Sequence, residues 1–213
     1  MQVQLYIFRI DFQVWYDYTE STRKILYLHL LIIMSNYINK IKAFYPLETW
    51  KTSETLRSKN ESVDIFDGEF QEFCDILLEL MYGYDWVWLA APQIGKNIRV
   101  IATTQRKEER KWYKIKKNII WETVMVNPEI IEHSEEKKIW EEACLSVPGL
   151  CGDVERWIWI VVRYQDKKWK QHVQKYSWFS AVVIQHEIDH LEWILFTDKV
   201  IGDLRKIDEK SDY

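Results

Sequence analysis

Glycine is scarce in this chain. Its 213 residues include 6 glycines, whereas an ordinary usage of about 7% would give about 15. Tryptophan is in excess, with 12 residues, so the two types together come close to an ordinary glycine content with a few tryptophans added. The shortage and the excess therefore require a common explanation.

Cysteine is also rare, and a long apolar run is missing. Cys74, Cys144 and Cys151 form an odd and sparse set, which argues against a disulfide scaffold and favours a reducing compartment. The longest apolar run, residues 25–33, is interrupted by His29 and is too short to span a bilayer. It also lacks the small-residue cleavage site of a signal peptide. We expect a cytoplasmic protein with no membrane partner.

The charge balance lacks a basic surplus. Lysine and arginine number 29 against 33 aspartates and glutamates, for a formal net charge of −4. The composition therefore offers no general attraction for a polyanion, and DNA is not expected as a partner. Residues 106–118 nevertheless hold seven basic residues and two glutamates. A solvated hairpin or loop is the simpler interpretation of this segment, and a transient contact with the ribosome is the alternative.

The chain is long enough for one domain with a sizeable buried core. Residues 1–33 contain no glycine or proline and show no clean periodicity, and Met34 begins a stretch that has the character of a natural protein start. The sequence therefore predicts a non-native or disordered extension over residues 1–33 and one folded domain over residues 34–213.

Apolar periodicity predicts two helices. Residues 69–84 place apolar side chains at three- and four-residue spacing, and residues 178–195 have an apolar centre. Segments rich in β-branched and aromatic residues, bounded by turn formers, predict strands. These segments span residues 98–102, 123–126 and 156–164. We therefore expect a single α+β domain in which mixed or antiparallel strands pack around the second helix.

The strongest chemical pattern is the H-E-x-x-H segment His186–His190 in the second predicted helix. Histidines four positions apart lie on one helical face, so both imidazoles can bind one metal ion while Glu187 stands beside the metal's water. A catalytic site of this kind needs a third protein ligand. Cys144 is one candidate, and the others are the downstream carboxylates Glu192, Asp198, Asp203 and Glu209. Because the carboxylates match no pattern of ligand spacing, Cys144 is favoured.

Three segments of the chain resemble the motifs of the peptide deformylase family. In that family the motifs run in the order G-Φ-G-Φ-A-A-P-Q, E-G-C-L-S and H-E-Φ-D-H, where Φ is an apolar residue. The corresponding segments here are Trp86–Gln93 (WVWLAAPQ), Glu142–Ser146 (EACLS) and His186–His190 (HEIDH). Three motifs in order are more specific than any one of them. The resemblance implies a deformylase-like metallohydrolase domain within residues 34–213.

The resemblance implies a metal-dependent hydrolase that removes the N-formyl group from the N-terminal formylmethionine of nascent polypeptides and releases formate. Its metal ligands are expected to be Cys144, His186 and His190. The ion is most often Fe²⁺ in this family, and Zn²⁺, Ni²⁺ or Co²⁺ can take its place. Glu187 is expected to take a proton from water and to pass it to the departing amine. Formylated nascent peptides are thus the expected partner.

The same motif matches assign the remaining site residues. The side-chain amide of Gln93 and the backbone N–H of Leu145 are expected to stabilise the developing oxyanion. The substrate-binding residues implied by the matches are Val87, Trp88, Leu89, Glu142, Val182 and Val183. The three valines are expected to line an apolar slot for the methionine side chain, and ordinary core packing is the alternative for them.

Five tryptophans stand where the family has glycine, namely Trp86, Trp88, Trp169, Trp178 and Trp193. One explanation is that UGA codons, which certain bacterial lineages read as glycine, have been written as tryptophan. The other is genuine replacement, which is costly wherever the backbone freedom of glycine is needed. Ala143, which replaces the glycine of the second motif, is a small change that the codon explanation does not cover.

Two functional alternatives remain. The H-E-x-x-H segment alone also fits an unrelated metalloprotease. If the tryptophans are genuine, the chain is instead a catalytically impaired, deformylase-like protein that binds peptides, because the Trp88 indole would occupy the groove where the substrate lies.

Overall fold

The computed structural model describes residues 20–106 and 119–207. By its internal contacts the chain divides into two units, residues 1–44 and residues 45–213. The second unit contains both β-sheets and the buried polar residues that the sequence marks as a site.

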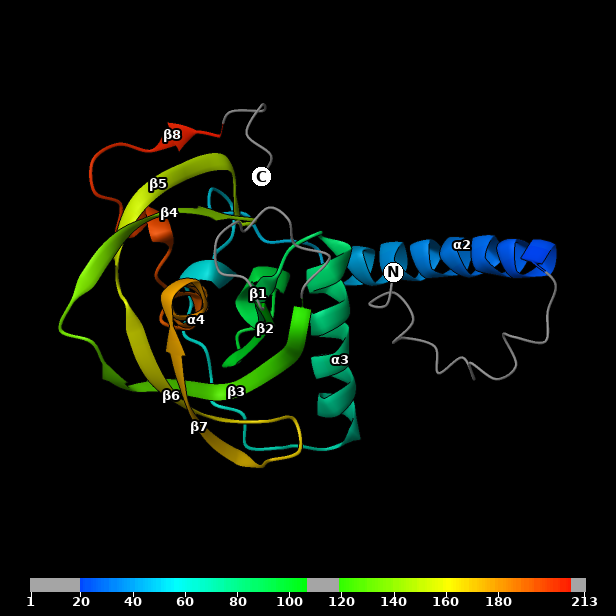
Figure 1. Cartoon of the computed structure of the whole chain (residues 1–213), viewed down its shortest axis with the longest axis horizontal. Helices are drawn as coiled ribbons and strands as arrows, with labels where there is room; N and C mark the ends of the chain where they lie inside the picture. The colour runs from blue at the N-terminus through cyan, green and yellow to red at the C-terminus, as the bar shows by residue number, and fades with distance from the viewer. Residues whose placement is uncertain (1–19, 107–118, 208–213) are drawn as a thin grey trace. The chain divides into compact units, whose positions relative to one another are not determined.

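The described part of the first unit is one helix, α2 (Glu20–Phe44) (Figure 1). The predicted boundary between residues 33 and 34 falls inside this helix. The extension over residues 1–33 stays a prediction. None of the described helices is both long and apolar enough to cross a membrane.

The second unit is built on two sheets in which all neighbouring strands are antiparallel. The larger sheet has the order β1-β2-β3-β6-β7, and its strands are β1 (Trp88–Ala90), β2 (Val100–Arg106), β3 (Ile119–His133), β6 (Trp159–Gln165) and β7 (Gln171–Ser177). The smaller sheet has the order β4-β5-β8, and its strands are β4 (Lys137–Cys144), β5 (Val147–Trp157) and β8 (Arg205–Lys206). Strand β1 is therefore an edge of the larger sheet.

Two helices and three single-turn 3₁₀ segments complete the described part of the second unit. They are α3 (Gly68–Gly83), α4 (Trp178–Leu191), η2 (Thr55–Arg57), η3 (Ala91–Ile94) and η5 (Phe196–Asp198). Helix α3 begins where the carboxylate of Asp67 accepts a hydrogen bond from the Phe70 N–H at 2.9 Å, which satisfies a free donor of the first turn. Its apolar face buries Leu77, Leu80 and Met81.

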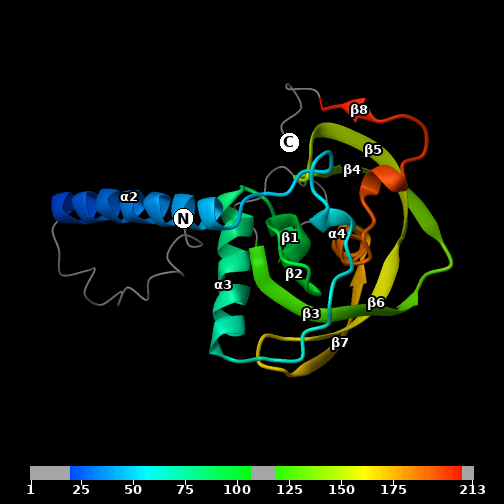
Figure 2. The same cartoon turned by 180° about the vertical axis from the view of Figure 1, so that it is seen from behind.

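Helix α4 lies at the centre of this unit. The two opposite views show it with the curved strands of both sheets around it (Figures 1 and 2). Every residue from Ala181 to Leu191 is buried, which explains why the helix is apolar on more than one face. Ile184 and Leu191 pack with strand residues such as Ile101 and Ile160 in one core cluster. Each such side chain contributes roughly 1.5–3 kcal/mol when it is fully buried. The polar residues of α4 are therefore held in a rigid, dry setting.

The α+β class with antiparallel strands around the second helix is confirmed. The first predicted helix, residues 69–84, corresponds to α3 within a residue at each end. The second starts at Trp178 as predicted but ends at Leu191, so its predicted end at residue 195 is wrong. The cause is a helix-ending turn, because the Ile194 N–H donates to the Asp189 carbonyl at 2.9 Å.

The strand predictions located three true strands but misplaced their ends. The segment 98–102 starts too early, because β2 begins at Val100. The segment 123–126 is the middle of the much longer β3. The segment 156–164 is wrong as one strand, because it joins the end of β5 to β6 across Ile158, whose N–H donates to the Ser134 hydroxyl at 3.0 Å. The basic segment 106–118 lies almost wholly outside the described residues.

Candidate active site and metal centre

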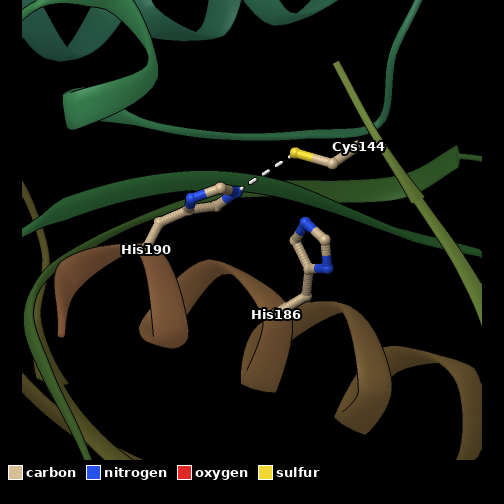
Figure 3. A group of neighbouring side chains, drawn as sticks. All are labelled: Cys144, His186 and His190. Atoms are coloured by element: carbon tan, nitrogen blue, oxygen red, sulfur yellow. Dashed lines mark hydrogen bonds between the residues drawn. The ribbon is translucent and has the colours of Figure 1, made fainter. Parts of the chain in front are cut away.

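Helix α4 places two imidazoles side by side in the interior. His186 and His190 are one turn apart, their ring centroids are 5.0 Å apart, and their exposed fractions are 4% and 1%. Both rings project from the same face of the helix (Figure 3). The i, i+4 spacing of the motif thus produces the arrangement predicted from it.

Cys144 reaches the same point from the last position of β4. The register of β4 against β5 shifts between Ala143 and Cys144, where the chain turns back into β5. The Sγ atom lies 3.3 Å from His190 Nε2, and Figure 3 shows the thiol directed at that ring. One potential ligand atom from each of Cys144, His186 and His190 lies within 4.8 Å of the others. The structure therefore brings together the three predicted ligands.

This cluster fits a metal ion. Within the described part of the chain, His186 Nε2 and both carboxylate oxygens of Glu187 are buried and have no hydrogen-bond partner. A buried polar atom that is left unpaired costs roughly 1–3 kcal/mol, so a bound cation and its water would satisfy groups that the protein leaves open. One thiolate and two imidazoles suit several first-row divalent ions.

Two of the four carboxylates that competed with Cys144 for the role of third ligand, Glu192 and Asp198, are paired with arginines, and Glu209 lies outside the described residues. Glu192 Oε1 accepts a hydrogen bond from Arg99 at 2.7 Å. Asp198 Oδ1 accepts one from Arg57 at 2.9 Å. Among the described residues, the group that could hold a metal is the Cys-His-His cluster.

Glu187 is fully enclosed next to the two histidines. Burial raises the pKa of its carboxyl group to about 7, although the nearby His190 and His186 act in the opposite direction. A carboxyl group with a pKa near neutrality can both accept and return a proton. Its Oε1 atom lies 3.9 Å from His186 Nε2.

Gln93 supplies an amide at the edge of the cluster. It belongs to η3, where Pro92 follows Ala91 at the start of the turn. The Gln93 Oε1 atom accepts a hydrogen bond from the Ala90 N–H at 2.8 Å, which fixes the amide so that Nε2 lies 3.4 Å from Cys144 Sγ. Leu145, the other predicted oxyanion donor, is half-buried in the turn directly after Cys144. Both residues thus lie beside the ligand cluster.

The profile of the polypeptide deformylase family matches residues 46–206. The chain belongs to the peptide deformylase family. Among the curated relatives, the peptide deformylase of Pseudothermotoga lettingae is 39% identical over 145 residues, which cover 68% of this chain and 77% of that protein. The peptide deformylase of Desulfotalea psychrophila is 37% identical over 158 residues, which cover 73% of this chain and 88% of that protein.

Solved peptide deformylase structures share the fold. The enzyme of Thermotoga maritima matches with a TM-score of 0.65 and 30% identity, over 74% of this chain and 98% of that one. A probable peptide deformylase of the Synechococcus phage S-SSM7 matches with a TM-score of 0.64 and 40% identity, over 73% of this chain and 99% of that one. The family and the metal-dependent deformylase activity predicted from the three motifs are confirmed.

The predicted substrate-binding residues of the deformylase fall into separate groups. Val87, Trp88 and Val183 pack together in one buried cluster, against the half-buried Trp86 and Phe179. The other three are not members of this cluster. Val182 and Leu89 are buried, in α4 and in β1, while the Glu142 carboxylate contacts His186 of the candidate ligand cluster.

The contacts of Glu142 indicate a positioning role. Its Oε2 atom accepts a hydrogen bond from His186 Nδ1 at 2.7 Å, which turns Nε2 of that ring toward Cys144. Arg156 donates to both Glu142 oxygens, at 2.6 Å and 2.9 Å. Burial by itself raises the pKa of Glu142, but the hydrogen bonds from Arg156 and His186 outweigh it and lower the pKa to about 2. Glu142 is thus a buried carboxylate whose charged form is stabilised by Arg156 and His186.

Arg156 is the site residue that sequence reasoning missed. Its guanidinium also donates to Asp189, and Lys199 Nζ donates to the other oxygen of Asp189 at 2.6 Å. A signal for Arg156 existed, because it lies two residues after Val154 in β5 and so faces the same buried side of the sheet. An arginine on the inward side of a strand indicates a buried ionic partner.

Proposed function

We propose that Cys144, His186 and His190 bind one divalent metal ion and that this site removes the formyl group from formylmethionyl peptides. The observation that carries the proposal is the buried cluster of one sulfur and two nitrogen ligands beside the unpaired carboxylate of Glu187. The membership of the peptide deformylase family supports ferrous iron as the native ion. Zinc, nickel and cobalt suit the same ligands.

The protein's own groups divide the work of hydrolysis. A bound divalent ion supplies a Lewis acid that lowers the pKa of water. Glu187 takes the proton from the attacking water and later gives it to the amine nitrogen, so that the C–N bond breaks and formate leaves. The Gln93 amide and the Leu145 N–H donate hydrogen bonds to the formyl oxygen as it gains negative charge. Glu142 holds His186 in the orientation that binding requires.

We place the substrate peptide alongside the edge strand β1. An edge strand presents free backbone groups to an extended peptide, and Val87, position 88 and Leu89 supply that edge. Val182 and Val183 of α4 form the apolar surface for the methionine side chain. Because formylated nascent peptides are made by ribosomes in the cytoplasm, we place the enzyme there, with a ribosome contact through residues 106–118 as a further expectation.

Metal content and formate release test this proposal separately. Cys144→Ala is expected to abolish binding of ferrous iron in anaerobic reconstitution, whereas Cys74→Ala, which changes a cysteine buried in α3, should leave it intact. Glu187→Gln should keep the iron and lower formate release from formyl-Met-Ala-Ser by about 10²–10⁴-fold. Stoichiometric iron in the Cys144→Ala protein would refute the ligand assignment.

A further inference from the structure

Three tryptophans occupy backbone conformations that tryptophan rarely adopts. In the described chain, five residues other than glycine have a positive φ: Asp85 (62°), Asn127 (50°), Trp169 (70°), Trp178 (54°) and Trp193 (63°). Aspartate and asparagine tolerate the left-handed region because their short side chains can form local hydrogen bonds. A bulky residue there is an outlier. The three bulky residues with a positive φ are therefore all tryptophans.

Trp193 holds the position that ends α4. Its N–H donates to the His190 carbonyl at 3.3 Å, and the following Ile194 N–H donates to the Asp189 carbonyl at 2.9 Å. These two hydrogen bonds form a Schellman motif, whose left-handed residue is usually glycine because glycine has no Cβ. The end of α4 thus has a glycine-type backbone at position 193.

Trp169 holds an equivalent position in the hairpin between β6 and β7. Its N–H donates to the Asp166 carbonyl at 3.0 Å, and the Asp166 N–H donates to the Lys170 carbonyl at 2.9 Å. A tight hairpin turn that closes on a left-handed residue favours glycine at that residue. Trp178 opens α4, and its N–H donates to the Ile158 carbonyl at 2.7 Å.

No buried contact requires an indole at these three turns. The exposed fractions of Trp169, Trp178 and Trp193 are 54%, 43% and 44%. Trp169 contacts the Phe66 ring and Trp178 lies under Lys138, both at the surface. The positive φ at these three positions disfavours any residue with a Cβ atom, whereas the indoles make only surface contacts.

Trp86 and Trp88 present the opposite problem, because Trp88 is buried and Trp86 is half-buried against it. Their rings are 5.4 Å apart, and Trp88 also contacts Phe179 at 5.7 Å. Buried indoles usually find a hydrogen-bond partner, but neither Nε1 atom has one among the described residues. Trp140 Nε1 shares this property, so the unpaired N–H is supporting evidence only. Trp88 is itself a residue of the edge strand β1, and its ring packs with Val87 and Val183 in one buried cluster.

Trp157 in β5 and Trp159 in β6 behave differently. Trp157 stacks on His133 with ring centroids 3.9 Å apart, and Trp159 lies under Lys175 Nζ at 3.7 Å. Neither is among the residues with positive φ, and extended backbone suits aromatic residues. Trp157 and Trp159 thus suit their backbone, in contrast to the tryptophans at the three left-handed positions.

We propose that the native polypeptide carries glycine at positions 86, 88, 169, 178 and 193, because UGA codons of its gene are read as glycine, and genuine tryptophan at positions 157 and 159. The three turns then have the residue that their backbone requires. With glycine at 86 and 88, the edge of β1 is open to a substrate peptide. This last consequence rests on the proposed function, whereas the assignment of glycine does not.

The direct test reads the gene and the native protein. The codons are expected to be UGA at the five positions and UGG at 157 and 159, and mass spectrometry of peptides from the protein made in its own cells should give glycine masses at all five. A tryptophan mass at position 169, 178 or 193, or UGG codons there, overturns the proposal.

A stability test examines the backbone argument in a recombinant chain. Gly and Ala are compared at the same position, so the loss of the indole cancels. At Trp169 and Trp193 the glycine variant should have a melting temperature about 2–8 °C above that of the alanine variant. At the control position Trp159, in β6, the order should reverse by about 1–4 °C. Alanine as the more stable residue at both turns overturns the left-handed assignment.

An activity test examines the groove. The chain with tryptophan at all five positions and the chain with glycine there are each loaded with ferrous iron. Iron content and formate release are measured for both. Equal iron in both with formate release at least about 100-fold higher in the glycine chain supports the open groove. Equal formate release contradicts it. Absence of iron from both would instead count against the proposed function, because iron content does not depend on the groove.

Discussion

At the scale of single residues, the site depends on a chain of buried charges. Lys199 contacts Asp189, Asp189 contacts Arg156, Arg156 contacts Glu142, and Glu142 contacts His186. The side chains of Arg156 and Glu142 are 3% and 5% exposed, so solvent screens their interaction little. The orientation of His186, a proposed metal ligand, is thus connected to a strand of the smaller sheet.

Removal of Arg156 should therefore have a large effect on stability. Arg156→Leu leaves two buried carboxylates without their main partner, and breaking a buried pair in this way costs about 3–5 kcal/mol. Urea unfolding followed by circular dichroism measures the change. Arg163→Leu is the matched control, because Arg163 pairs with Glu129 at the surface, where an ion pair contributes about 0–1 kcal/mol. Equal losses in the two variants would contradict the buried network.

Most site residues were predictable at this scale, and one was not. The proposed ligands Cys144, His186 and His190 lie in short local motifs, so the sequence predicts them without the fold. Arg156 acquires its role only when β5 lies against the metal cluster, which depends on contacts 14 to 33 residues apart. The alternation of β5 indicates that Arg156 faces inward, but it does not identify Glu142 and Asp189 as its partners.

At the scale of elements, helices were predicted better than strands. The apolar period of α3 is continuous, and its start coincides with a capping residue. The first three residues of β4 are exposed, so its sequence lacks the alternation of apolar and polar residues that identifies a strand. Its pairing with β5 is what stabilises it as a strand. The end of α4 was placed four residues too late because a tryptophan at position 193 hides the usual glycine stop signal.

The cap of α3 gives a prediction at the element scale. Asp67→Ala removes the acceptor for the Phe70 N–H and should lower the free energy of unfolding by about 0.5–2 kcal/mol. Asp67→Asn keeps an acceptor of the same shape and should cost little. Thermal unfolding of the two variants measures the difference. An equal loss of unfolding free energy in both would show that the carboxylate acts by its charge rather than as a cap.

At the scale of the whole molecule, the candidate site joins parts that are distant in sequence. Cys144 comes from the smaller sheet, Gln93 follows the edge strand of the larger sheet, and the histidines come from the helix between them. The family resemblance indicated which residues meet. The positions of β4 and β7 depend on backbone pairing between distant segments, which local propensity does not encode.

A metal ion at this junction should stabilise the whole domain, since it ties β4 to α4. An ion that binds only the folded chain adds about 2.7 kcal/mol when its free concentration is 100 times its dissociation constant, which corresponds to a rise of about 5–10 °C in melting temperature for a domain of this size. Calorimetry before and after treatment with a chelator measures this difference. Cys144→Ala should melt at the same temperature in both conditions, because one of the three ligands is missing. Cys74→Ala should keep the full response, since burial raises the pKa of Cys74 to about 12 and leaves it a neutral core thiol. A chelator response that survives Cys144→Ala would mean that the ion which stabilises the fold binds at a different place.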